Sequence, residues 1–117
     1  MFLDDASYGT PTSAYSLAKA IWATAERPQL RGVLHWTDGG TATWYDFALA
    51  IAEEAHAAGL MPVKAEVTPI SAAAYPTAAR RPANSVLDTR EAIAQLGFSP
   101  SPWRAELQAT LQTLKAA

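Results

Sequence analysis

The sequence contains no cysteine among its 117 residues. That absence excludes a disulfide scaffold, a thiolate zinc site and a cysteine nucleophile, and it is typical of a reducing compartment. No apolar run approaches the roughly 20 residues that a membrane-spanning helix needs. The first five residues, Met-Phe-Leu-Asp-Asp, form neither the basic nor the apolar region of a signal peptide. We therefore expect a cytoplasmic protein with no membrane partner.

Positive charge is also scarce. Nine Lys and Arg residues against eleven Asp and Glu residues give a net charge of −2, so no basic excess favours nucleic acid as a partner. Half of the residues are hydrophobic and 17% are charged, which excludes a disordered tail or a coiled coil. The length is that of one domain.

Proline and glycine divide the chain into short periodic segments. Helical periodicity predicts four helices, over residues 13–27, 43–59, 88–97 and 101–114. Thr12 is the expected N-cap of the first helix. Leu17, Ile21 and Trp22 are its expected buried stripe. In the second helix, Thr43 and Asp46 form a capping arrangement.

Short β-rich runs predict strands over residues 32–36 and 63–70, and a third over residues 85–87. The fold class is therefore α/β: a small mixed domain of about four helices and two or three short strands. Two of these strands have no obvious partner within the chain, so we expect them to extend a sheet supplied by another domain.

One pair of residues imitates a catalytic motif. Tyr15-x-x-x-Lys19 has the spacing at which short-chain dehydrogenases let a lysine lower the pKa of a catalytic tyrosine. However, no Gly-rich phosphate turn follows a strand, so a nicotinamide cofactor has no cradle and we predict no catalytic or cofactor-binding residue. His35 and His56 join no carboxylate cluster, so no metal site is predicted.

Three further groups of residues are candidates for a binding site, and the first of them has two possible interpretations. Arg80-Arg81 lies in a Pro-bounded segment and either binds a diphosphate or forms a solvated surface pair. Asp38-Gly39-Gly40 lacks phosphate-loop spacing and is predicted to be a plain turn. Of the four tryptophans, Trp36 and Trp44 flank this loop and are candidates to line a pocket.

Several blocks of the chain resemble a known family. Residues 8–14, 32–37, 43–48 and 75–88, with the late Pro102-Trp103-Arg104, resemble the C-terminal third of dTDP-4-dehydrorhamnose reductase, an extended short-chain dehydrogenase. The blocks follow the family's order and spacing and cover nearly the whole chain. The segment around Arg81-Pro82 is the most specific.

The resemblance implies that residues 1–117 form the sugar-nucleotide-binding domain, without the Rossmann domain that carries the family's NADPH turn and catalytic residues. Tyr15 and Lys19 fall at ordinary positions of a following helix. Some members bind Mg²⁺ through acids where this chain has Tyr15 and Thr113, so no metal is carried over. The implied substrate-binding residues are Arg81, Arg80, Tyr75, Tyr8 and Thr12.

In the family, the complete enzyme reduces dTDP-4-dehydro-β-L-rhamnose to dTDP-L-rhamnose with NADPH, for cell-surface polysaccharide. We expect this chain to bind the dTDP-sugar but to be inactive alone, and to associate with a Rossmann domain or with itself. The alternative is a non-catalytic interaction or regulatory module with a reductase-like fold.

Overall fold

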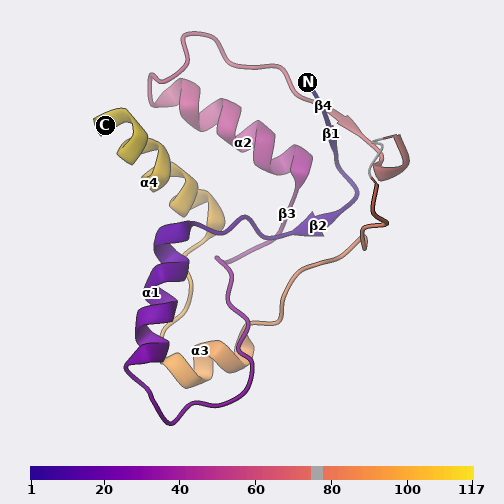
Figure 1. The fold of residues 1–117 in the computed structure, drawn as a ribbon. Coiled ribbons are helices and arrows are strands. Elements are labelled where there is room, and N and C mark those ends of the chain that lie inside the picture. The colour runs from indigo at the N-terminus through magenta and orange to yellow at the C-terminus, as the bar shows by residue number, and fades with distance from the viewer. Residues whose placement is uncertain (75–77) are drawn as a thin grey trace.

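The computed structural model describes residues 1–74 and 78–117 and contains four α-helices and four short strands in that part of the chain (Figure 1). The predicted mixed α/β class is confirmed. In chain order the elements are β1 (Phe2–Asp4), β2 (Tyr8–Gly9), α1 (Ala14–Ala25), β3 (Ala42–Thr43), α2 (Trp44–Ala57), β4 (Thr68–Ile70), a 3₁₀ turn (Ala72–Ala74), α3 (Arg90–Leu96) and α4 (Trp103–Ala116).

The strands form two small sheets rather than one. β1 pairs with β4 in parallel, with Phe2 opposite Thr68, and β2 pairs with β3 antiparallel, with Tyr8 opposite Thr43. The strand predicted over residues 63–70 therefore forms only in its last three residues. β1 is just three residues long, so residues 63–67 have no strand to pair with, and Val63 is 73% exposed.

The other two predicted strands do not form. Residues 32–36 are irregular and Val33 is 80% exposed, because no neighbouring strand offers them a hydrogen-bonding edge. Residues 85–87 are also irregular; the preceding Asn84 forms an isolated bridge with Tyr8, and the Ser85 amide donates to the Tyr8 carbonyl at 2.8 Å. Residues 32–36 thus form no strand, and the pairing beside residues 85–87 ends after Ser85 because β2 is only two residues long.

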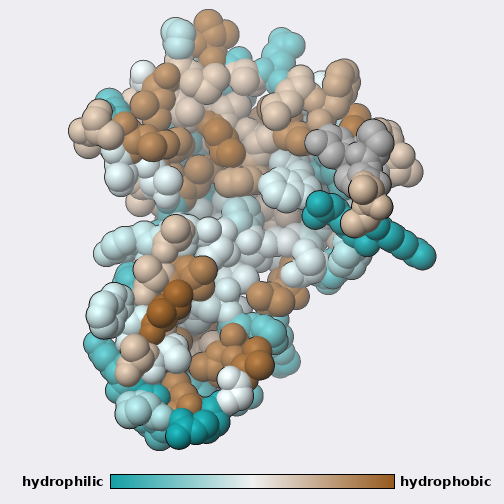
Figure 2. All heavy atoms as spheres, viewed as in Figure 1, coloured by the Kyte–Doolittle hydropathy of each residue, from teal (hydrophilic) through white to brown (hydrophobic). Residues whose placement is uncertain are grey.

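Helix α1 presents the opposite face from the one predicted. Its N-cap is Ser13 rather than Thr12, and its buried residues are Ser16 and Ala20. The predicted core stripe faces outward: Ile21 is 61% and Trp22 is 71% exposed. Figure 2 shows hydrophobic atoms at the surface in the region of α1.

The carboxylate of Asp38 accounts for this orientation. It accepts hydrogen bonds from the backbone N–H of Ser13, at 2.8 Å, and from the hydroxyl of Ser16. Asp38 is only 2% exposed, so its polar partners must face inward with it. The residues predicted to be a plain turn thus include the buried anchor of α1.

Helices α2 and α4 pack against each other. The predicted capping box of α2 is confirmed, with the Thr43 side chain bonded to the Asp46 amide and the Asp46 side chain to the Thr43 amide. The buried residues of α2 are all small, Ala50, Ala52 and Ala55, which allows close packing against both α4 and β1. From α4, the guanidinium of Arg104 donates to Glu53 at 2.6 Å and to Glu54 at 3.0 Å.

The last two helices begin one or two residues later than predicted. The N-cap of α3 is Thr89, while Asp88 instead accepts hydrogen bonds from Arg90. Gly97 ends α3 with a φ of +80°, as the sequence predicts. Pro102 precedes α4, whose one buried apolar residue is Leu111. No helix in residues 1–74 and 78–117 is long and apolar enough to cross a membrane.

The molecule is flat and exposes much of its surface. It measures 48 × 38 × 20 Å, with a radius of gyration of 16.3 Å, against about 13 Å for a compact chain of this length. Its accessible surface is 7889 Å², roughly 1,700 Å² more than a typical monomer of this mass exposes. The core among the described residues is small and rich in alanine.

Candidate functional site

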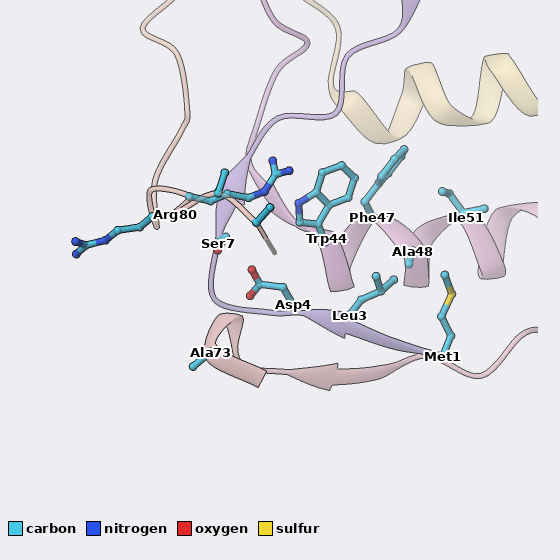
Figure 3. A pocket seen from close by; sticks show the side chains of 13 residues that line it. Met1, Leu3, Asp4, Ser7, Trp44, Phe47, Ala48, Ile51, Ala73 and Arg80 are labelled. Atoms are coloured by element: carbon cyan, nitrogen blue, oxygen red, sulfur yellow. The ribbon is translucent and has the colours of Figure 1, made fainter. Parts of the chain in front are cut away.

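A cavity of about 890 Å³ lies between β1, the start of α2 and the segment after β4 (Figure 3). Cavities that bind small molecules typically measure about 300–1,000 Å³. The described residues that line it are Met1, Leu3, Asp4, Ser7, Trp44, Phe47, Ala48, Ile51, Ala73, Ala78, Ala79, Arg80 and Arg81.

The lining divides into two ends (Figure 3). Met1, Leu3 and Ile51 make one end apolar, and Asp4, Ser7 and Arg80 lie at the other. β1 contributes to both ends, since the apolar Leu3 is followed by the acidic Asp4. A ligand with a charged part and a neutral part matches such a cavity better than a wholly charged one.

The first turn of α2 places two aromatic side chains at the cavity. The capping box fixes where the helix begins, so Trp44 and Phe47 project from adjacent turns of one face. Phe47 is held by Trp103 of α4, with ring centroids 6.1 Å apart and an edge-on angle of 81°. Trp44 is 56% exposed, so a large part of its side chain is accessible to a ligand.

Asp4 is a buried carboxylate in the cavity wall. Burial raises its pKa, but hydrogen bonds from the Ser7 side chain and from the Ala6 and Ser7 backbone amides outweigh that effect, so the pKa of Asp4 lies below its ordinary value. The bond from the Ala6 amide measures 2.7 Å. Asp4 is therefore a fixed negative charge, and it disfavours a phosphate group at its own position.

Both predicted arginines line the cavity. In Figure 3 the guanidinium of Arg80 is directed away from Asp4 and Trp44. Adjacent residues of an extended segment point in opposite directions, and Pro82 restricts Arg81 to extended geometry. Arg81 is thereby the arginine suited to face the cavity.

The remaining predicted site residues have other environments. Tyr8 pairs with Thr43 in the small antiparallel sheet and is not among the lining residues. The Thr12 hydroxyl bonds to the carbonyl of Thr10 and to the amide of Asp38, in the turn before α1. Tyr75 lies outside the described residues. Trp36 packs against Phe98, with ring centroids 5.0 Å apart, and does not line the cavity either.

Tyr15 and Lys19, which have the spacing of the dehydrogenase motif, lie away from the cavity. The Lys19 ammonium is 5.9 Å from the centroid of the Tyr15 ring, and neither residue lines the cavity. Within residues 1–74 and 78–117, no three His, Asp or Glu side chains come together as a metal site would require.

Two residues of this site were not assigned to it from the sequence. Because Trp44 flanks a loop, the sequence indicates that it could line a pocket, but it does not indicate which part of a ligand Trp44 would contact. Asp4 had no signal at all, because its burial depends on β1 pairing with β4, 64 or more residues away in the chain.

Comparison with known proteins agrees with the fold and the resemblance. A family model described as the RmlD substrate binding domain matches residues 1–116. The dTDP-4-dehydrorhamnose reductase of Shigella flexneri is 35% identical over 111 residues, which are 92% of this chain and 37% of that protein. The reductase of Salmonella typhimurium is 40% identical over 88 residues, covering 72% of this chain and 29% of that protein.

A crystal structure of a dTDP-4-dehydrorhamnose reductase from Clostridium acetobutylicum superimposes with a TM-score of 0.85 at 26% identity, covering 98% of this chain and 39% of that one. The chain thus spans little more than a third of the length of these relatives. On the match over residues 1–116, the chain belongs to the RmlD substrate-binding domain family.

Proposed function

We propose that this chain binds the dTDP-sugar of a dTDP-4-dehydrorhamnose reductase and forms one wall of its sugar-nucleotide cleft, in the cytoplasm. The observation that carries the proposal is the cavity of about 890 Å³, which is divided into a polar end, with Arg80, and an apolar end, and which Arg81 also lines. A sugar nucleotide has the same division, since its diphosphate is charged and its rings are neutral.

The diphosphate would be held by Arg81. A guanidinium offers two parallel N–H donors to phosphate oxygens, which is stronger and more directional than a lysine contact. Pro82 restricts the backbone of Arg81 to extended geometry, so Arg81 loses less conformational entropy when it binds the diphosphate. Arg80, directed away from Asp4 and Trp44, contributes less.

The chain would not reduce its ligand alone. The 117 residues contain no Gly-rich turn to cradle the phosphates of a dinucleotide. In the complete reductase, NADPH supplies the hydride that reduces the 4-keto group of the sugar, and the cofactor belongs to the Rossmann domain. The part assigned to this chain is to bind and orient the substrate.

The exposed surface supports association with a further domain or a second copy. The chain exposes roughly 1,700 Å² more than a typical monomer of its mass, which is about twice the roughly 800 Å² that one partner buries in a standard protein interface. The same surplus favours the alternative function, a non-catalytic interaction module. Binding of dTDP separates the two, because an interaction module has no reason to retain it.

The test is calorimetric titration of the 117-residue chain with dTDP. We expect Arg81→Ala to weaken binding by about 10- to 100-fold, the range for loss of a charge-assisted bidentate contact. Arg80→Ala is the matched control, because it removes the same charge from the neighbouring position. Equal effects of the two substitutions would show that only general charge attraction is present. No binding by the unsubstituted chain would favour the interaction module.

A further inference from the structure

Trp44 occupies a particular position in the cavity. It is the first residue of α2, it lines the cavity together with Asp4, Ser7 and Arg81, and it is 56% exposed. Exposure alone does not distinguish Trp44, since Trp22 is exposed as well, but Trp44 combines an accessible aromatic ring with a place in the cavity lining.

The surroundings of Trp44 favour a ligand over a structural role. Phe47, one turn further along α2, packs edge-on against Trp103, whereas no ring contact to Trp44 occurs among the described residues. In Figure 3, Trp44 lies between the polar end, with Asp4, Ser7 and Arg80, and the apolar end, with Ile51 and Met1. A ring bound against Trp44 would thus have a charged group on one side only.

The negative charge of Asp4 limits where a phosphate can bind at the polar end of the cavity. Its carboxylate is held by Ser7 and by its own backbone turn, and among the described residues no ion pair joins it to an arginine. Phosphate oxygens are therefore repelled from Asp4 and attracted to the arginines, while hydrogen-bond donors on a neutral ring are tolerated beside it.

We propose that Trp44 is the stacking platform for the planar base of the nucleotide, with the diphosphate at Arg81. This inference rests on the proposed function and adds a requirement to it: recognition depends on a heterocyclic ring, not on the diphosphate alone. Aromatic stacking tolerates different bases, so the platform selects nucleoside diphosphates as a class over pyrophosphate and sugar phosphates.

The experiment compares two probes, dTDP and inorganic pyrophosphate, on the 117-residue chain. Loss of a base–aromatic stack corresponds to roughly 5- to 150-fold in affinity. We therefore expect Trp44→Ala to weaken dTDP binding within that range and to leave pyrophosphate binding unchanged. Trp44→Phe keeps a ring and should restore most of the dTDP affinity. Arg81→Ala should weaken both probes.

Trp22→Ala is the matched control, because Trp22 is also exposed, at 71%, but lies on α1 and does not line the cavity. Trp22→Ala should change neither affinity. If Trp44→Ala leaves dTDP affinity unchanged, or weakens pyrophosphate equally, the stacking role is wrong although the proposed function stands. If the unsubstituted chain binds neither probe, the proposed function fails and the platform with it.

Discussion

Replacing Asp38 with alanine tests how α1 is attached to the rest of the domain. The substitution removes the acceptor of two hydrogen bonds, from the Ser13 amide and the Ser16 hydroxyl, at a position that is 2% exposed. Hydrogen bonds to charged groups contribute about 1.5–3 kcal/mol each, and two that share one carboxylate are not additive. We expect Asp38→Ala to lower the free energy of unfolding by about 3 kcal/mol.

That loss converts to a measurable shift in melting temperature. An unfolding entropy of about 2.1 cal/mol/K per residue gives roughly 0.25 kcal/mol/K for the whole chain, so the melting temperature should fall by about 12 °C. Urea unfolding followed by circular dichroism measures the free energy, and the thermal scan measures the shift. Asp38→Asn keeps the shape and one acceptor oxygen, so its effect should be intermediate.

Asp5→Ala is the control for removing an acidic residue. Asp5 is exposed and its described hydrogen bond, to the carbonyl of Ile70, comes from its backbone. Its loss should change the unfolding free energy by less than about 0.5 kcal/mol. If Asp38→Ala also stays within that margin, the carboxylate does not anchor α1, and the inward orientation of Ser16 needs another cause.

Two further predictions concern the backbone and a surface charge pair. Gly40 has a φ of +94°, and an added Cβ would lie 3.2 Å from Cδ1 of Trp103, so Gly40→Ala should destabilise the fold by about 1–2 kcal/mol. Gly59→Ala, at a φ of +78° with nothing within 4 Å, should be less destabilising in the same urea titration. Hydrogen bonds from the side chain and the backbone amide of Arg90 lower the pKa of Asp88 to about 2, so carbon-detected NMR should find that value. Arg90→Ala removes the guanidinium but keeps the amide donor, so it should raise the pKa of Asp88 part of the way toward its ordinary value. Because the folded-state pKa is the lower one, the pair stabilises the fold above pH 4 and that contribution is lost as the pH falls toward 2; an Asp88 pKa unchanged by Arg90→Ala would contradict this.

Features encoded within a few residues could be predicted from the sequence. The capping box of Thr43 and Asp46, the helix from Trp44 and the left-handed turn at Gly97 each depend on contacts between neighbours in the chain. The sequence also singled out Arg80 and Arg81 because they lie in a Pro-bounded segment; both line the cavity, and their role in binding stays a prediction. The family resemblance is also carried by short blocks of sequence, and the family model that matches residues 1–116 confirms it.

Features that depend on distant partners were not predictable. Residues 32–36 have a strand's composition but no strand beside them, and residues 63–67 extend beyond the three-residue edge that β1 offers. Hydrophobic periodicity marked Ile21 and Trp22 as core, whereas the buried carboxylate of Asp38, 22 residues from Ser16, turned the opposite face inward.

The sequence by itself thus determined where the helices lie, the class of fold and the family, since these follow from local spacing and composition. Only the tertiary structure decided which faces are buried and which side chains share the cavity. Asp4 and Trp44 both line the cavity because β1 pairs with β4 and α2 packs against β1. These contacts join segments that are far apart in the chain, so local propensity and spacing do not specify them.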